Sequence, residues 1–501
     1  MRTSATTTPR TTSTSNPNVM TKELKQDIKT NWRWYLCALL FAATTVNYLD
    51  RQVLSLTWKD FIAPEFKWTD TDYGMITGFF SLFYAAISLF AGKGIDKLGT
   101  KKGYLLAIFI WSTGACLHAG CGWLTMHIEG LPNKEALMAV QSGSALALSI
   151  STISVYLFIA CRLILALGES GNFPSAIKVT AEYFPKKDRA FATAIFNSGA
   201  SVGALAAPAT IPFIAKAWGW ESAFIIIGAL GYIWMFFWIK WYDKPQQSKH
   251  VNAQELAYIQ QDDDDDAPVE EVKEEKTIPF LKCFTYRQTW EFICGKFFTD
   301  GVWWFLLFWV PAYFSDVYHY ASASKEGATL IFILYLIVTV LSIFGGYLPK
   351  IFVEKKHMEP YSGRMRAMLI FAFFPLLALL AQPLGQYSAL FPAVIIGIAG
   401  AAHQSWSANL YSTIGDMFPK STVASITGIG TMAGGVASYL INQGSGILFD
   451  YADHAGKMFT FFGFEGKPAA YMMVFCYCGV AYLVAWCIMK ALVPKYKKIE
   501  L

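Results

Sequence analysis

Apolar runs of about twenty residues recur along this chain and constrain its fold more than any other feature. A helix needs about 20 apolar residues to cross the hydrocarbon core of a bilayer. Of the 501 residues, 54% are hydrophobic, which is more than soluble domains of this size carry. The sequence therefore predicts an all-α membrane protein with twelve transmembrane helices. Their approximate ranges are 34–57, 73–92, 103–124, 148–175, 190–214, 221–241, 289–314, 327–353, 366–384, 388–413, 423–448 and 469–492.

Lysine and arginine residues gather on one side of the predicted membrane. Basic residues are retained on the cytoplasmic side, so both termini are expected in the cytoplasm. The basic clusters are then topology signals, and we expect no nucleic-acid partner. Only 7 of the 41 lie in the alternate, outer loops, namely Lys59, Lys67, Lys134, Lys216, Lys325, Lys457 and Lys467.

A polar linker separates six apolar runs from the other six. Residues 243–286 include Asp262–Asp266, five consecutive aspartates that cannot bury a core and lack the spaced ligands of a calcium loop. A short repeat supports the division, because Glu182–Lys186 (EYFPK) returns as Asp416–Lys420 (DMFPK). Both copies leave a span on the cytoplasmic side, which predicts parallel repeats about an axis along the membrane normal. The expected units are a disordered tail at 1–31, bundles at 32–242 and 287–493, the linker, and a second tail at 494–501.

The first apolar run carries two ionisable residues, Asp50 and Arg51. Such groups cost several kcal/mol at membrane depth and rarely persist there unless they function. Neighbours on a helix point about 100° apart, so the two side chains can serve separate tasks. The guanidinium of Arg51 suits a carboxylate of a substrate, and an isolated Asp50 suits proton exchange. The alternative is a static ion pair with another helix.

The fourth run carries Arg162 and Glu169 on one helix face, about 10 Å apart along the axis. This separation is too long for a direct pair without bending, but a substrate could lie between them. The alternative is that Arg162 and Glu169 only support the structure and do not bind a substrate. Two cations and two carboxylates in apolar helices thus predict a site that binds an anion and handles a proton.

Polar and aromatic residues in later runs suit a hydroxylated substrate. Asp300 precedes Trp303 and Trp304, whose rings could stack on a sugar or form an interfacial belt. The segment from His403 to Asn409 includes Gln404, and its amides and hydroxyls predict a wet wall. Further candidates for substrate contact are Tyr48, Tyr84 and Asn197.

A glycine-rich basic loop joins the second and third runs. It contains Gly92, Asp96, Lys97, Gly99, Lys101 and Lys102. Its glycines are expected to form the turn, and Asp96 to cap a helix N-terminus across the interface between the halves. This pattern is similar to the signature loop of the major facilitator superfamily, where it implies a gating function.

The sequence resembles the anion:cation symporter family of that superfamily, over about residues 35–495. Asn47–Arg51, Gly168–Pro174 and Val302–Phe305 are most similar to bacterial hexuronate transporters. The resemblance implies two six-helix bundles with alternating access. It also implies that Asp50 and Glu169 carry protons and that Arg51 and Arg162 act on an anionic substrate. The long outer stretch 125–150 and the acidic linker depart from the family pattern.

These observations predict a proton-coupled symporter of a sugar acid, galacturonate or glucuronate, in a bacterial inner membrane. The alternatives are a galactonate or glucarate carrier, and a transporter-like receptor that binds the sugar acid without moving it. No ATP-binding, metal or nucleophile motif is present, so we expect neither an enzyme nor a cofactor beyond the proton gradient. We expect a monomer.

Overall fold

The computed structural model describes residues 30–261, 278–345 and 347–499, and most of them lie in helices. Residues 1–29 of the tail predicted at 1–31, and the run Asp262–Asp266, fall outside the described residues. Each of the twelve predicted spans coincides with a long helix or with a broken set of helices. The prediction of an all-α fold is therefore confirmed, with one small hairpin of β1 (Thr460–Phe461) and β2 (Phe464–Glu465) in the described part.

The first six spans extend from α2 to α11. Helix α2 (Trp32–Thr57) continues through the π-helical turn η1 (Trp58–Ile62) into α3 (Ala63–Phe66). The other helices of this half are α4 (Asp70–Leu98), α5 (Thr100–His118), α6 (Cys121–Ile128), α7 (Lys134–Ala139), α8 (Ala145–Glu169), α9 (Asn172–Tyr183), α10 (Lys186–Trp218) and α11 (Trp220–Trp241). The short η2 (Pro245–Gln247) and α12 (Ala253–Ile259) follow.

The last six spans extend from α14 to α21, after the short α13 (Phe280–Cys283). They comprise α14 (Arg287–Tyr318), α15 (Lys325–Gly345), α16 (Tyr347–Lys350), η4 (Ile351–Lys355), α17 (Pro360–Phe373), η5 (Phe374–Leu380), α18 (Ala381–Gly385), α19 (Leu390–Met417), α20 (Lys420–Ala455), η6 (Gly456–Met458) and α21 (Gly466–Leu492).

The repeated pentapeptide ends one helix and starts the next at the same position in the two halves. Helices α9 and α19 both end immediately before a phenylalanine in extended conformation, Phe184 and Phe418. In each half the next residue is a proline, Pro185 or Pro419, which is the N-cap of α10 or of α20. Proline fixes φ and disfavours helix in the residue before it, so the same residues impose the same break.

Three of the spanning helices carry polar residues within their apolar runs. Among the described residues, eight helices are long and apolar enough to cross a membrane, or nine if the bent pair α5 and α6 counts as one span. The remaining spans are α2, α19 and α20, with 26, 28 and 36 residues. Polar side chains persist in spanning helices where they face protein or water. These three helices are therefore the ones expected to line a polar path.

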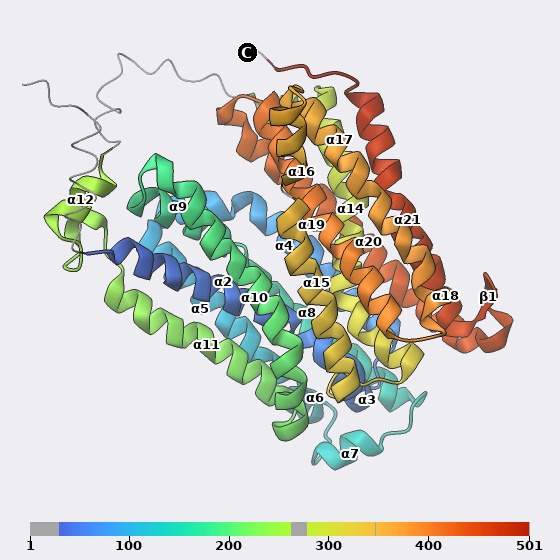
Figure 1. The fold of residues 1–501 in the computed structure, drawn as a ribbon. Helices are drawn as coiled ribbons and strands as arrows, with labels where there is room; N and C mark the ends of the chain where they lie inside the picture. Colours follow the sequence, from blue (N-terminus) through green and yellow to red (C-terminus); the bar gives the residue numbers. More distant parts are fainter. Residues whose placement is uncertain (1–29, 262–277, 346, 500–501) are drawn as a thin grey trace, which may run out of the picture.

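The two halves converge at one end and diverge at the other (Figure 1). They meet along α4 with α20, α10 with α15, and α2 with α14. Close approach needs glycine, since a Cβ on Gly74 would lie 2.5 Å from the carbonyl oxygen of Asn442. We call the converging end, with α3, α7 and β1–β2, the hairpin face. The diverging end, with α9 and α12, is the linker face.

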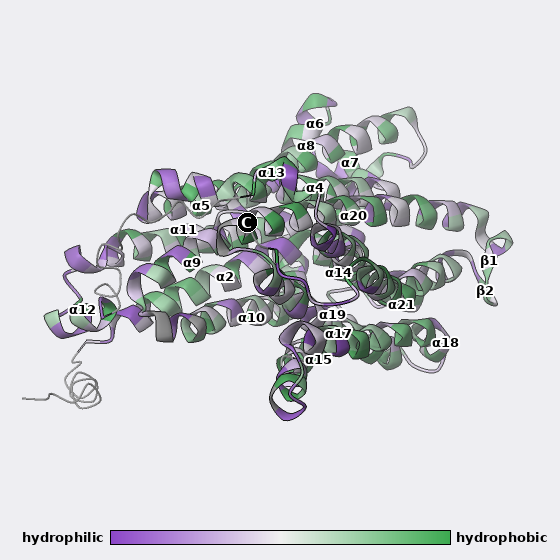
Figure 2. Cartoon of the chain, turned by 90° about the horizontal axis from the view of Figure 1, so that it is seen from above, coloured by the Kyte–Doolittle hydropathy of each residue, from purple (hydrophilic) through white to green (hydrophobic). Residues whose placement is uncertain are grey.

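The surface of the helices suits lipid. Large apolar side chains such as Phe90, Tyr156, Phe236 and Ile343 are more than 60% exposed. Viewed from above, hydrophobic residues follow the long helices, whereas hydrophilic residues gather in peripheral segments such as α12 (Figure 2). The chain is thus a multi-pass membrane protein whose polar residues lie inside the bundles or at their ends.

Candidate functional site

A buried ion pair between α2 and α8 lies at the centre of the candidate site. Arg51 donates from Nη2 and Nε to the same oxygen of Glu169, at 2.7 and 3.1 Å. The two residues are 6% and 1% exposed. The structure therefore pairs Glu169 with Arg51 and not with Arg162, the partner that the sequence had left open. The other oxygen of Glu169 has no hydrogen-bond partner among the described residues.

The position of Glu169 follows from a close contact between α8 and α5. Gly168 leaves no room for a Cβ, which would clash with the backbone at Trp111. Helix α8 then ends at Glu169, and Asn172 at the start of α9 accepts a hydrogen bond of 2.7 Å from Tyr104. The glycines around Glu169 thus let the helix approach its neighbour and stop, which holds the carboxylate against α2.

Aromatic rings from both halves surround the Arg51 guanidinium. Its carbon lies 4.8 Å from the ring centre of Tyr84, 5.2 Å from Tyr48 and 5.3 Å from Trp304. A planar cation stacks favourably on aromatic faces. Since Trp304 belongs to α14, Arg51 lies where the two halves meet. The predicted residues Tyr48, Arg51, Tyr84, Glu169 and Trp304 are therefore brought together.

Asp50 of α2 and Arg162 of α8 are also buried, and the charges of both interact with that of Glu169. Asp50 is 1% exposed and neither of its oxygens has a hydrogen-bond partner in the described part of the chain. Arg162 is 2% exposed, lacks partners for Nε and Nη1 there, and lies 5.1 Å from the Phe80 ring. A buried carboxylate without a hydrogen bond is costly when ionised, and protonation relieves that cost. Asp50 thus has the surroundings of a group that gains and loses a proton.

The other residues predicted to contact substrate are not part of the cluster around Arg51. Trp303 instead stacks on His403, with ring centres 5.1 Å apart. Asn409 is buried and donates to the backbone oxygen of Ser405 at 2.8 Å. Gln404 is half-buried in α19, and Asn197 is exposed on α10. These residues belong to α10, α14 and α19 and are not among those that surround the arginine.

Sequence reasoning missed one buried cation. Lys296 of α14 is 4% exposed and forms an ion pair of 2.6 Å with Asp300, one turn further along the same helix. Its Nζ lies 4.6 Å from the centre of the Tyr411 ring. Lys296 lies inside the apolar run 289–314, close to the basic residues that precede that run, and a count of basic residues by loop does not separate it from them. Its place in that run was the signal that could have revealed it.

The glycine-rich loop is mostly helical. Helix α4 continues through Gly92, Asp96 and Lys97 to Leu98, and the turn itself rests on Gly99, with φ of +79°. Asp96 forms an ion pair of 2.8 Å with Lys178 of α9, in its own half, and Lys101 pairs with Asp243 at 2.7 Å. The expected cap on a helix of the other half is therefore not the contact that Asp96 makes here. Lys102 is exposed in the first turn of α5.

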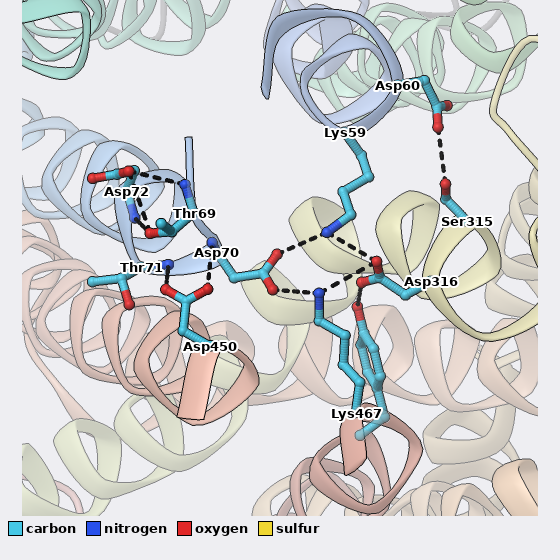
Figure 3. Close-up of polar contacts among 11 residues, drawn as sticks. Lys59, Asp60, Thr69, Asp70, Thr71, Asp72, Ser315, Asp316, Asp450 and Lys467 are labelled. Atoms are coloured by element: carbon cyan, nitrogen blue, oxygen red, sulfur yellow. Dashed lines mark hydrogen bonds and ion pairs between the residues drawn. The ribbon is translucent and has the colours of Figure 1, made fainter. Parts of the chain in front are cut away.

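A cap across the halves is present on the opposite, hairpin face. Asp450 of α20 accepts hydrogen bonds from the backbone nitrogens of Asp70 and Thr71, at 2.9 and 2.7 Å, and so caps the N-terminus of α4 (Figure 3). Asp60 adds a second crossing, since it accepts from Ser315 Oγ at 2.9 Å. Carboxylates at helix N-termini are favoured by the partial positive charge there. The sequence predicts a cap across the halves by Asp96. The structure has such a cap on the hairpin face, and Asp450 provides it.

Four charged side chains complete this closure. Lys59 and Asp70 come from the first half, and Asp316 and Lys467 come from the second. Lys59 bridges Asp70 and Asp316 at 3.0 and 2.9 Å, and Lys467 contacts the same two carboxylates (Figure 3). We call these four residues the charge square. With it the hairpin face is held shut, while the bundles diverge toward the linker face.

Comparisons with known proteins agree with this geometry. A family profile described as Major Facilitator Superfamily matches residues 40–441. The hexuronate transporter of Escherichia coli K12 is 27% identical over 421 residues, 83% of this chain and 88% of that protein. The galacturonate transporter of Dickeya chrysanthemi is 26% identical, over 64% of this chain and 82% of that protein. A solved bacterial homologue of the human lysosomal transporter Spinster shares the fold, with a TM-score of 0.67 and 16% identity over 92% of this chain and 98% of that one.

Proposed function

This chain belongs to the Major Facilitator Superfamily, and on that premise we propose that it imports a sugar acid together with protons. It is a membrane transporter and not an enzyme. We propose a hexuronate, galacturonate or glucuronate, as the principal substrate, with galactonate or glucarate as the alternative. The hexuronate and galacturonate transporters among its relatives support this substrate class. The proposed setting is a bacterial cytoplasmic membrane, with a monomer whose linker face and termini lie in the cytoplasm.

The buried pair of Arg51 with Glu169 is the single observation that carries the mechanism. The carboxylate of a sugar acid and the carboxylate of Glu169 suit the same guanidinium edge. When Glu169 takes up a proton it no longer competes as an anion, and Arg51 is released to the substrate. Substrate and proton are therefore favoured together at this site, and each raises the affinity for the other.

Asp50 provides a second place for a proton. It is buried in the same half, and neither of its oxygens has a hydrogen-bond partner among the described residues, so its ionised form is costly there. When Arg51 binds the substrate, protonation of Asp50 keeps the net negative charge buried between the helices low while the two halves move. The proton gradient then drives accumulation, because the carrier returns empty only after these groups release their protons.

Closure of the hairpin face sets the direction of release. With the charge square formed, substrate leaves between the bundles at the linker face, and the distribution of basic residues favours this face as the cytoplasmic one. Uptake requires the square to open and the linker face to close. Movement of one repeat against the other around a fixed site is how such halves alternate access.

We predict that Glu169→Gln and Asp50→Asn abolish accumulation driven by protons and leave exchange of substrate in place. Both changes mimic the protonated state, so the carrier binds substrate but cannot release its proton. Uptake of radiolabelled glucuronate and galacturonate into proteoliposomes with an imposed pH gradient measures accumulation, and counterflow measures exchange. Glu326→Gln, at the exposed start of α15, is the matched control. Accumulation by both variants would refute the assignment, whereas binding by the unaltered protein without any counterflow would indicate a receptor.

Selectivity among sugar acids is expected to depend on α19. Its amides contact hydroxyl groups, while Arg51 binds the carboxylate that all sugar acids share. We predict that Gln404→Ala and Asn409→Ala change the ranking of galacturonate, glucuronate and galactonate as competitors of uptake. The control is Gln386→Ala, at an exposed position beyond α18. An equal loss for every competitor, with the ranking intact, would contradict this division.

A further inference from the structure

We infer that Lys296 binds a second carboxylate of the substrate, so that this transporter also accepts six-carbon dicarboxylic sugar acids. Asp300 then takes up a proton and releases the Lys296 ammonium to that carboxylate. This inference rests on the proposed function and concerns the same site. Four observations carry it: the buried ion pair itself, its place on α14, the groups that surround it, and its charge.

The ion pair of Lys296 with Asp300 lies within one helix, so the pair itself does not join two helices. Ion pairs that hold a bundle together join different helices. Here both residues belong to α14, four positions apart, with Lys296 4% and Asp300 9% exposed. Burying two charges costs free energy that a pair inside one helix does not return as helix packing. A binding function gives a reason for the pair that structural support does not.

The helix face that carries the pair also carries Trp304. Lys296, Asp300 and Trp304 recur every four residues, so they form a stripe along α14. Trp304 lies 5.3 Å from the Arg51 guanidinium, which places one end of the stripe against the site of the first half. Lys296 is eight residues away, about 12 Å along the axis toward the linker face. The flexible lysine stem shortens this span, so a substrate held at Arg51 extends toward the ammonium.

The surroundings of the pair favour a site rather than a sealed core. Tyr411, which lies over Lys296, is 37% exposed, and the Asp300 side chain is 12% exposed. On α20 the pair meets Gly434, whose position has no space for a Cβ beside Asp300. The titratable groups facing the pair from other helices are Tyr411 and His403 of α19 and Tyr482 of α21. Among these described neighbours, the carboxylate of Asp300 is the one anion available to Lys296.

Charge balance connects this pair to protons. Lys296 and Asp300 are together neutral, so a monocarboxylate at Arg51 leaves them undisturbed. A second carboxylate at Lys296 adds a buried negative charge unless Asp300 becomes protonated and leaves the ammonium to the substrate. Each dicarboxylate is therefore carried with one more proton than a monocarboxylate, and its uptake depends more steeply on pH.

The test compares glucarate with glucuronate, which differ in the second carboxylate. Half-saturating concentrations for uptake are measured in proteoliposomes for the unaltered protein, Lys296→Gln, Lys296→Arg and Asp300→Asn. Lys325→Gln, at the exposed start of α15, is the control. In Lys296→Gln the half-saturating concentration of glucarate, divided by that of glucuronate, should rise at least tenfold. In Lys296→Arg this ratio should return most of the way to that of the unaltered protein. Asp300→Asn should flatten the pH dependence of glucarate uptake to that of glucuronate.

Each outcome decides the inference. An unchanged ratio in Lys296→Gln, or equal pH profiles for the two substrates in the unaltered protein, overturns it. If Lys296→Gln does not insert and fold, Asp300→Asn decides alone, and an unaltered glucarate profile in that variant is the refuting result. Uptake of glucuronate without glucarate also refutes the inference and leaves the proposed function standing. Uptake of neither, nor of galacturonate or galactonate, refutes the proposed function itself.

Discussion

Replacing Arg51 by lysine is expected to weaken sugar-acid binding nearly as much as replacing it by alanine. The guanidinium uses two nitrogens on one carboxylate and stacks near three aromatic rings, from both halves of the protein. An ammonium keeps the charge but has neither the planar fork nor the stacking face. Loss of a buried, charge-assisted contact costs about 2–5 kcal/mol, or roughly thirtyfold to several thousandfold in affinity.

Equilibrium binding of glucuronate to the purified protein in detergent measures this effect, by calorimetry. Arg364→Lys is the matched control, because Arg364 pairs with Asp416 at 2.8 Å on partly exposed surface and is expected to change affinity less than twofold. Elution as a single species confirms that each variant is folded. Affinity within threefold of the unaltered protein in Arg51→Lys would mean that the site needs only a point charge, which contradicts the clamp.

The positions of the spans could be read from the sequence because hydrocarbon imposes a simple rule on length and polarity. The same rule singled out Asp50, Arg51, Arg162 and Glu169, since each interrupts an apolar run. What the rule cannot supply is the rotation of one helix relative to another. The partner of Glu169 depends on how α2 and α8 face each other, and their contact chose Arg51 over Arg162, which shares a helix with Glu169.

The second half was harder to predict because its functional groups interrupt the pattern less clearly. Lys296 lies ten residues into α14, near enough to a basic segment to be grouped with it. Trp303 and Trp304 are neighbours in sequence, yet one stacks on His403 and the other on Arg51, because successive helix positions face different directions. The charge square was out of reach for another reason. Its members lie near helix ends and become partners only when the halves dock in one particular state.

The charge square makes the second large effect predictable. We expect the double variant Asp70→Asn, Asp316→Asn to open the hairpin face. Both carboxylates are under 10% exposed, and each contacts Lys59 and Lys467, so their loss leaves two lysines of opposite halves close together without counter-charges. Removing one partner of a buried pair costs about 3–5 kcal/mol, and here that cost falls on the closed state alone. The balance between closed and open hairpin face should shift by on the order of a hundredfold or more.

Accessibility of a cysteine beneath the square reports this shift. Thr77 of α4 is 2% exposed and lies seven residues, about 10 Å, inside from Asp70. In a background without the nine native cysteines, Thr77→Cys should react slowly with a membrane-impermeant maleimide added from the hairpin face. The double variant should react at least tenfold faster, whereas Asp453→Asn, on the exposed end of α20, should not. Because the square is largely buried, 0.5 M salt should reproduce little of this gain. An unchanged rate in the double variant would mean that the apolar contacts of Trp58, Tyr73 and Trp309 below the square hold the face shut without it.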